Sequence, residues 1–368
     1  MKKKRPLRVL FGTNDIGFRI GLYSKFLQKQ YGDKILVHSY VTYKLPKHHY
    51  ETHFTYEYNN LFAKPVFVRW FLTFYNFLRF FGKYDMFFFF SGETLLTRKL
   101  RPLEFRLYKL LGKRIVMSFV GADIRSPKYL QWKNEHIYEF LKGTEVPKKT
   151  EPFQDKLIRD SRKYAEKIFV STPDLLDIIP EAEYFPVMLD FEQFGRDFEA
   201  AEPFEKPDDE VWILHAPSEP KTKGSHYIHH IAEELEEKFG KKVRFVMPAR
   251  NYQPVAAAYS VTRYELFRWY KSCDIVIDQM LIGWYGMQTV EAIASGNRTI
   301  VFIDEKLKKQ LSPCPSLVVC DLVSLKSVLE NLILSEQKKT LNNFQNKSWV
   351  EQNHTLVGQA SLFDFMIQ

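Results

Sequence analysis

The sequence has few cysteines and no long uninterrupted apolar run. The three cysteines among its 368 residues have no paired spacing and no histidine cluster beside them; they are Cys273, Cys314 and Cys320. This argues against a disulfide framework and a zinc site, and we expect a reducing compartment. No stretch approaches the roughly 20 apolar residues that cross a bilayer. Charged residues interrupt the most hydrophobic region, at Arg69, Arg79, Lys83 and Asp85.

The N-terminal region leads us to expect no secretory signal. Its apolar run, residues 7–11, is too short for the core of a signal peptide, and Gly12 ends it. We therefore expect a cytoplasmic protein that is soluble or sits peripherally on the inner face of the cell membrane.

Charge is divided unevenly between the two halves of the chain. Residues 1–196 carry 34 Lys and Arg against 21 Asp and Glu, and residues 197–368 carry 19 against 23. The positive surplus of the first half points to an anionic partner, with nucleic acid, a membrane surface and a phosphorylated substrate as the alternatives.

Short apolar runs alternate with longer helical patterns, which is typical of βαβ units around a parallel sheet. In the first half we expect helices at 17–30, 65–81, 94–111 and 155–165. The strands expected between them are residues 8–11, 35–38, 86–90, 114–119, 167–171 and 183–186.

A second series of the same kind follows the acidic segment 198–209. Its strands are expected at 211–215, 243–246, 274–278, 298–303 and 317–320, and its helices at 224–239, 262–272, 287–295 and 322–335. The repeated alternation predicts an α/β fold of two Rossmann-like, doubly wound parallel-sheet domains. We place the first domain at 1–195 and the second at 196–350, with 351–368 packing back on the first.

The segment 215–225 has the features of a phosphate-binding loop. An apolar strand ends in a polar loop that leads to the start of a helix and contains Lys221, Lys223 and Gly224. Gly224 allows close approach to the backbone, free N–H groups at the helix start face outward, and Lys223 adds a full positive charge for a diphosphate. A solvated surface loop is the alternative interpretation.

The segment 274–296 combines a buried strand, a glycine-bearing turn and a short helix. Backbone amides at the positive end of this helix can meet a sugar or a phosphate. Glu291 lies about one turn further in, where a carboxylate can accept both hydroxyl protons of a ribose; a surface glutamate is the alternative. The amides belong to Gly286, Met287, Gln288 and Thr289.

These two segments, in this order, resemble the donor-binding half of GT-B glycosyltransferases, in particular the large retaining family that uses sugar nucleotides (group 1, or family 4-like). The resemblance implies two domains facing a central cleft. It also implies that Lys223, before Gly224, contacts the donor phosphates, and that Glu291, which begins Glu-Ala-Ile-Ala-Ser-Gly, contacts the ribose. Gly286 and Met287 match the donor-sugar loop.

The first half resembles the same family in its loops on the acceptor side. These loops are residues 11–17 and 120–125. Asp15 and Asp123 follow expected strands, where α/β folds place ligands; helix capping is the alternative, and we favour it for Asp15. The other acceptor-side residues that the resemblance implies are Gly12, Asn14, Gly17 and Gly121.

Three positions depart from the family pattern. Pro217 stands where an arginine usually precedes the phosphate lysine, and Val120 replaces a histidine. Gly283 replaces the first acid of a Glu-x7-Glu pair, with Asp278 the nearest acidic candidate. Two alternatives therefore stay open: a sugar-nucleotide epimerase of the same fold, and a catalytically weak donor-binding or scaffolding homologue.

The chemistry expected is glycosyl transfer from a nucleoside diphosphate sugar to a hydroxyl acceptor, with Lys223, Glu291 and Asp123 as the catalytic candidates. Fixed positive charge at the leaving oxygens does the work of a divalent ion, so we expect no metal and no cofactor beyond the donor substrate. The resemblance implies retention at the anomeric carbon. The expected acceptor is a glycan or lipid-linked glycan in surface polysaccharide or glycoconjugate synthesis.

The stretch 67–90 is unusually aromatic, with 13 Phe, Tyr or Trp among 24 residues. Helical spacing predicts a stripe buried in the core; it comprises Phe67, Trp70, Phe71, Phe74, Leu78 and Phe81. Phe77 and Phe80 lie off this stripe, near cations suited to lipid phosphates. Core packing is the favoured interpretation of the stretch, and docking on an anionic membrane surface is the further hypothesis. Nucleic-acid binding ranks low because no recognition motif appears.

Overall fold

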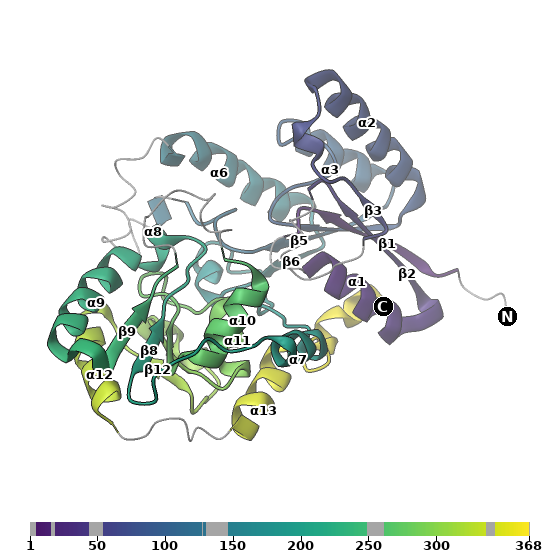
Figure 1. The fold of residues 1–368 in the computed structure, drawn as a ribbon. Helices are drawn as coiled ribbons and strands as arrows, with labels where there is room; N and C mark the ends of the chain where they lie inside the picture. Colours follow the sequence, from purple (N-terminus) through teal and green to yellow (C-terminus); the bar gives the residue numbers. More distant parts are fainter. Residues whose placement is uncertain are drawn as a thin grey trace. The chain divides into compact units, whose positions relative to one another are not determined.

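The computed structural model describes residues 5–15, 19–43, 54–126, 128–129, 146–248, 261–335 and 343–367 (Figure 1). They form two compact units. The first takes in the described residues up to 129, those of 146–186 and those from 360 onward; the second takes in those of 187–359. None of the described helices combines the length and apolar content needed to span a bilayer.

The first unit is built on a seven-stranded parallel sheet of order β3-β2-β1-β4-β5-β6-β7. Its strands are β1 (Leu7–Thr13), β2 (Ile35–Val41), β3 (Tyr56–Glu57), β4 (Met86–Phe90), β5 (Arg114–Phe119), β6 (Lys167–Val170) and β7 (Glu183–Tyr184). Its helices are α1 (Arg19–Tyr31), α2 (Val66–Lys83), α3 (Arg101–Leu110) and α6 (Val146–Tyr164).

The strand β4 explains part of the aromatic content. All five of its residues are buried, and the strand lies between β1 and β5. Tyr108 of α3 stacks on Phe87 with ring centroids 4.2 Å apart, and Tyr23 of α1 contacts Phe90 at 5.7 Å. Because Phe87 and Phe90 point to opposite faces, helices cover both sides of the sheet. The prediction of a central strand at 86–90 is confirmed.

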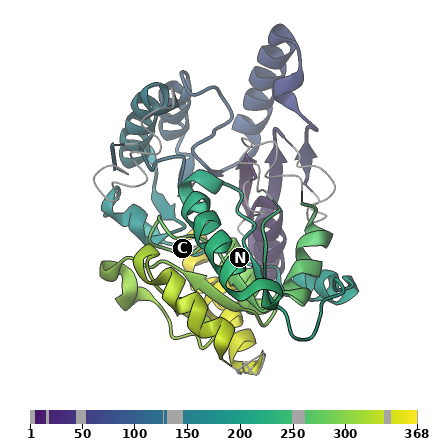
Figure 2. The same cartoon turned by 60° about the vertical axis from the view of Figure 1, so that its left-hand side comes forward.

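The second unit is built on a five-stranded parallel sheet of order β12-β11-β10-β8-β9 (Figure 2). Its strands are β8 (Val211–Leu214), β9 (Val243–Val246), β10 (Ile275–Ile277), β11 (Arg298–Val301) and β12 (Leu317–Val319). Its helices are α7 (Phe191–Ala200), α8 (Pro220–Lys223), α9 (Ser225–Phe239), α10 (Arg263–Ser272), α11 (Met287–Ala294), α12 (Leu322–Leu334) and α13 (Asn343–His354).

Both sheets reverse their strand order beside the first strand of the unit. The chain runs outward from β1 to β3 and returns to β4 on the other side of β1, and it runs from β8 to β9 and returns to β10. Open α/β sheets bind ligands at the carboxyl ends of the strands at such a switch point. The sites of this protein are therefore expected where β1 and β4 end, and where β8 and β10 end.

One expected helix starts later in the structure, and one short helix was not expected. The helix expected at 94–111 begins only at Arg101, because Pro102 stands in the first turn of α3, a position that proline favours. The helix expected at 224–239 forms as α9, and α8 precedes it as a separate turn because Gly224, with a left-handed φ of 82°, ends that turn. The two-residue strand β3 and the helix α7, capped by Asp190, were not predicted.

The helix expected at 65–81 forms as α2, but with the opposite face buried. Its buried residues are Asn76, Phe77 and Phe80. The stripe assigned to the core faces solvent, with exposed fractions of 88% for Phe67, 70% for Phe71 and 56% for Phe74. Trp70 and Leu78 are exposed as well, and Phe81 is half-buried.

The prediction of a buried stripe on α2 is therefore wrong. The hypothesis that Phe77 and Phe80 are the rings that meet a membrane is wrong as well, because both are buried. Both faces of this helix are apolar, so the spacing of its aromatic residues cannot decide which face packs inward. Tertiary contacts decide it: the Phe80 ring lies 5.0 Å from Tyr40 and 5.9 Å from Tyr84, centroid to centroid.

Candidate functional site

The two segments singled out in the second unit meet at the switch point of its sheet. Lys223 ends the short helix α8, which follows β8, and Asp278 directly follows β10. Lys223 Nζ lies 2.5 Å from Asp278 Oδ1. The backbones are joined too, since the Met280 N–H donates to the carbonyl oxygen of Lys223 at 3.0 Å. The phosphate-loop lysine and the segment leading into α11 therefore form one cluster.

Asp278 connects this cluster to the start of α11. The side chain is fully buried, and Oδ2 accepts from the Gly286 N–H at 3.0 Å and from the Thr289 hydroxyl at 2.7 Å. Burial acts to raise the pKa of Asp278, but the Lys223 ammonium and these donors outweigh it and hold the pKa below its ordinary value. The carboxylate is ionised, so the positive charge of Lys223 is balanced within the unit.

Position 224 requires glycine. With a φ of 82°, a Cβ there would also lie 3.2 Å from Cγ of Leu281 and 3.5 Å from Cβ of Met280. The Gly224 and Lys223 amides donate to Pro220 and Glu219 in the preceding helical turn. The expectation that these two amides are free is therefore wrong, because the residues before them form α8 rather than an open loop.

His215 holds the two ends of the phosphate-loop segment together. Its Nδ1 lies 2.9 Å from the Ile277 carbonyl oxygen and its Nε2 lies 2.7 Å from the Ser225 hydroxyl at the start of α9. The ring is fully buried, and this burial lowers the pKa of His215 to about 4. A neutral imidazole therefore anchors the loop to the neighbouring strand.

The start of α11 leaves polar groups available for a ligand. It has no side-chain cap, so the amides of its first turn lie at the positive end of the helix. Gln288 is 8% exposed, and neither its Nε2 nor its Oε1 has a hydrogen-bond partner in the described part of the chain. A buried amide without partners costs about 1–3 kcal/mol, so Gln288 is a candidate ligand contact through its side chain.

Glu291 is buried rather than exposed on the helix surface. It is 2% exposed, and its two oxygens accept from Arg263 Nη2 at 2.5 Å and from the Tyr270 hydroxyl at 3.1 Å. This excludes the interpretation as a surface glutamate. Glu291 and Gln288 lie one turn apart on α11 and so share a face. The role of Glu291 at a ribose stays a prediction.

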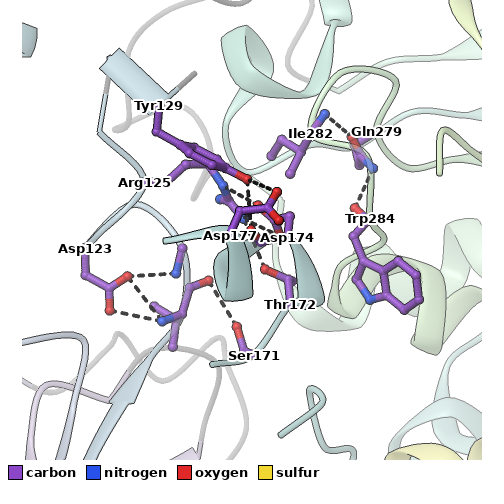
Figure 3. A network of polar contacts seen from close by, with 12 residues as sticks. Asp123, Arg125, Tyr129, Ser171, Thr172, Asp174, Asp177, Gln279, Ile282 and Trp284 are labelled. Carbon is purple, nitrogen blue, oxygen red and sulfur yellow. Dashed lines mark hydrogen bonds and ion pairs between the residues drawn. The ribbon is translucent and has the colours of Figure 1, made fainter. Parts of the chain in front are cut away.

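Gln279 shapes the loop between β10 and α11 (Figure 3). Its Oε1 accepts from the N–H groups of Leu281 at 3.1 Å and Ile282 at 2.7 Å, and its Nε2 donates to the carbonyls of Trp284 and Phe302. These bonds hold the backbone that leads to Gly286.

Gly283, which replaces the family's first acid, lies inside this loop. It has a φ of 87°, and a Cβ there would lie 3.0 Å from Cβ of Asp304. An acidic side chain has neither the conformation nor the space at this position. Asp278 supplies the carboxylate of the cluster from the end of β10 instead.

The remaining donor-side candidates lie around this cluster. Lys221 is exposed on α8, and Gly286 and Met287 are half-buried at the start of α11. The Gly286 N–H donates to Asp278, so the expectation that this amide is free for a ligand is wrong. Contact of Lys221 and Met287 with a donor remains a prediction.

The first unit contains a cavity of about 800 Å³ at its own switch point. Its walls come from the ends of β1 and β2, from α2 and from the loop after β4. The lining is mostly apolar and also holds charged residues; it includes Leu61, Trp70, Leu95, Leu96, the cations Arg69 and Lys99, and the ion pair of Arg98 with Glu93. Glu104 anchors the loop after β4 by accepting the N–H groups of Leu95 and Leu96 at 3.0 and 2.9 Å.

The acceptor-side candidates are divided by the structure. Asn14 lines the cavity. Gly12 lies in β1, where a Cβ would be 3.1 Å from the Tyr40 carbonyl oxygen, and Gly121 follows β5 with a φ of 139°. Neither of these glycines is among the residues that line the cavity. Gly17 lies outside the described residues.

Asp123 organises its own loop rather than pointing at a neighbouring segment (Figure 3). Its carboxylate accepts from the N–H groups of Val120 at 3.0 Å and Gly121 at 2.7 Å. Arg125 then joins this loop to the turn after β6 through a 2.9 Å ion pair with buried Asp174. A catalytic role for Asp123 stays a prediction, and the observed contacts are those of a loop-stabilising residue.

Asp15 follows β1 and acts on the start of α1. Its Oδ1 accepts from the Ile20 N–H at 2.9 Å, which confirms the favoured interpretation as a capping residue. Burial raises the pKa of Asp15 to about 6.

Sequence reasoning missed four polar residues of the second unit. They are His215, Arg263, Gln279 and the side chain of Gln288. Gln279 carried a usable signal, because a polar residue directly after a buried parallel strand lies at the ligand edge of the sheet. Arg263 had no such signal, since its partner Glu291 is on a different helix.

Comparison with known proteins identifies the fold. No protein-family model and no curated protein matches the sequence. Sucrose-phosphate synthase from Thermosynechococcus elongatus is similar over 98% of this chain and 99% of its own, with a TM-score of 0.58 and 11% identity. HepE from Anabaena, in complex with UDP and glucose, covers the same shares with a TM-score of 0.57 and 11% identity.

A third similar structure is the catalytic domain of starch synthase IV from Arabidopsis thaliana, bound to ADP and acarbose. It has a TM-score of 0.56 and 12% identity, and the match covers 99% of both chains. At such identities the likeness establishes the fold and leaves the activity to the site. This chain therefore has the GT-B fold that its sequence predicts, built on two Rossmann-like parallel-sheet units.

Proposed function

We propose that this chain is a glycosyltransferase that moves a sugar from a nucleoside diphosphate sugar to a hydroxyl acceptor. One observation carries the proposal: Lys223 of α8 is held by Asp278 beside the uncapped start of α11, the helix that also carries buried Glu291, at the switch point of the second unit. The presence of UDP and ADP in the similar HepE and starch synthase structures is consistent with a nucleotide donor.

In the proposed reaction the second unit stabilises the departing diphosphate. The bond between the anomeric carbon and the phosphate oxygen breaks, and its electron pair leaves on that oxygen. Lys223 and the first-turn amides of α11 place positive charge where this negative charge develops. The acceptor oxygen bonds to the anomeric carbon on the same face, and its proton passes to the released diphosphate. Glu291 holds the ribose, and the reaction needs no metal.

The proposed acceptor is a glycan or lipid-linked glycan in the synthesis of surface polysaccharide or glycoconjugate. The cavity of the first unit, with Asn14 in its wall, is its binding place. Asp123 and Gly121 contribute the neighbouring loop. The chain works in the cytoplasm, peripherally at the inner face of the membrane.

Calorimetric titration with UDP, ADP and GDP, alone and as sugar conjugates, tests the donor site. We expect Lys223→Ala to weaken binding about 10- to 100-fold, since a hydrogen bond to a charged group contributes about 1.5–3 kcal/mol. Lys242→Ala, which removes an exposed lysine of the same unit, should bind as the parent protein does.

Lys223→Ala also leaves Asp278 buried without its partner, so folding needs a separate control. The double variant Lys223→Met with Asp278→Asn keeps the site neutral and should fold while still failing to bind the donor. Full donor binding by this double variant would refute the assignment. Sugar-nucleotide turnover in the absence of any acceptor would instead favour an epimerase, and tight binding without turnover a donor-binding homologue.

A further inference from the structure

We propose that the outer face of α2 is a docking surface for an anionic lipid bilayer, and that it presents the neighbouring cavity to an acceptor that resides in that bilayer. The outer face comprises Phe67, Phe71, Phe74 and Leu78, which recur at helical spacing along one side of α2. This inference deepens the proposed function by naming the surface that meets the membrane, and the nature of the acceptor rests on that proposed function.

The outer face exposes far more apolar surface than an isolated side chain would. Phe67 is 88% exposed, Phe71 70% and Leu78 54%. Trp70 and Tyr75 flank them, 48% and 50% exposed. Contiguous apolar surface of this kind marks interaction sites in stable proteins.

The inner face of α2 already packs in the core of the first unit. The outer face is therefore not exposed because the helix is wrongly rotated. Phe77 and Phe80 are buried among rings of the first unit, with Phe77 5.2 Å from Phe81 and Phe80 5.1 Å from Tyr56. Rotating α2 to bury Phe67 would expose Phe80. The helix therefore carries two apolar faces, of which the fold buries one.

Charge identifies the partner as an anionic lipid surface. No acidic residue occurs from Tyr58 to Tyr84, and this stretch contains four cations: Lys64, Arg69, Arg79 and Lys83. Arg79 lies over the Tyr56 ring at 4.6 Å, and Lys83 donates to the Tyr56 hydroxyl at 2.7 Å, which places both cations at the edge of α2 nearest β3. Rings that enter the acyl boundary next to cations that meet phosphates are the pattern of interfacial helices.

The cavity shares a wall with this helix. Arg69, Trp70 and Thr73 line it from α2, and Phe62 lines it from the turn that precedes α2. A molecule whose acyl chain stays in the bilayer could therefore reach the cavity along α2 with its polar part first. The apolar lining together with Arg69 and Lys99 fits an amphiphile with a phosphate-linked polar group. The acceptor class is accordingly a phosphate-linked lipid.

Sedimentation of the full chain with vesicles tests the docking. The protein should bind vesicles of phosphatidylcholine and phosphatidylglycerol, bind vesicles of phosphatidylcholine alone at least tenfold more weakly, and lose binding as salt rises. Phe67→Ser with Phe71→Ser should reduce binding at least tenfold. Val323→Ser with Val357→Ser, which removes two exposed valines of the second unit, should have no effect.

Two further readouts separate the outcomes. Brominated lipids should quench Trp70, and Trp70→Phe should remove that quenching. A chain that ignores anionic vesicles, or that forms a dimer broken by Phe67→Ser with Phe71→Ser, would overturn the proposal in favour of a protein partner. Nucleotide titration of the same variants keeps the two proposals apart, because loss of vesicle binding should leave donor binding unchanged.

Discussion

The two units differ in the side chains that surround their candidate binding sites. In the second unit the cations near the switch point are paired inside the unit, Lys223 with Asp278 and Arg263 with Glu291, and each carboxylate is buried. In the first unit the helix beside the cavity exposes Phe67, Phe71 and Phe74 to solvent and carries no acidic residue.

This difference shows which kind of interaction each unit offers a ligand. The second unit keeps charges in fixed positions, where a ligand competes for them without rearranging the backbone. The first unit exposes apolar surface, whose favourable burial needs a partner. A polar donor and an amphiphilic acceptor are the ligands that these two environments suit.

The largest expected effect comes from breaking the buried pair of the second unit. Asp278→Ala removes the partner of Lys223 and the acceptor of Gly286 and Thr289, and we expect the free energy of unfolding to fall by about 3–5 kcal/mol. Urea unfolding measures it, with exposed Asp208→Ala as the control. A loss below 1 kcal/mol would show that the pair adds little to the second unit.

The matching test in the first unit compares the two faces of α2. Phe80→Ala removes a fully buried ring and should lower stability by about 3–5 kcal/mol, whereas Phe67→Ala removes an exposed one and should change it by less than about 0.5 kcal/mol. Thermal and urea unfolding measure both variants. A larger loss of stability in Phe67→Ala than in Phe80→Ala would show that the stripe predicted from the sequence is the buried face after all.

Acidification should change the contributions of the two units to stability in opposite directions. Buried His215 and His354, both in the second unit, have pKa values lowered by burial to about 4 from an ordinary 6.5. Unfolding then takes up protons below pH 6.5, so stability present at pH 7 is lost as pH falls from 6.5 toward 4, by about 1.4 kcal/mol per pH unit and histidine.

Asp15 in the first unit opposes this loss. Its pKa of about 6 exceeds the ordinary 3.8, so its contribution is full below pH 3.8 and is lost as pH rises through 6. Urea unfolding at pH 7.0, 5.5 and 4.5 measures the net slope. His215→Gln should flatten the slope and Asp15→Asn should steepen it; equal slopes in all three proteins would contradict the assignment.

The smallest expected effect concerns the unpaired amide of the second unit. Gln288→Leu replaces a buried polar group without partners by an apolar one of similar size, so the free chain should gain about 1 kcal/mol of stability. Donor affinity should fall if the carboxamide contacts the ligand. Thermal unfolding with and without UDP distinguishes the two effects, and Val290→Leu on the same helix controls for packing. A stability loss with unchanged donor affinity would make Gln288 a structural residue.

Much of the fold could be predicted because its signals are local. The run at 86–90 predicts a central strand, since a strand buried on both faces needs apolar side chains at every position. The alternation of strands and helices predicts two doubly wound sheets. Element ends were less well predicted: α3 begins at Arg101, next to Pro102, and the short helix α8, which ends at Gly224, was not predicted.

The candidate site was predictable only in part. The segments around Lys223 and Glu291 were identified, because glycine-bearing turns before helices have a recognisable pattern. The partners of these residues were not, because Asp278 and Arg263 reach them only through sheet order and helix packing.

The sequence by itself determined the class of fold, the presence of two successive α/β units and the segments that lead into each switch point. These features depend on side-chain period and turn chemistry within a few residues. Tertiary structure decided which face of α2 is buried, that Lys223 is held by Asp278, and that Glu291 is internal. Those outcomes depend on contacts between residues far apart in the chain, whose energies no local pattern contains.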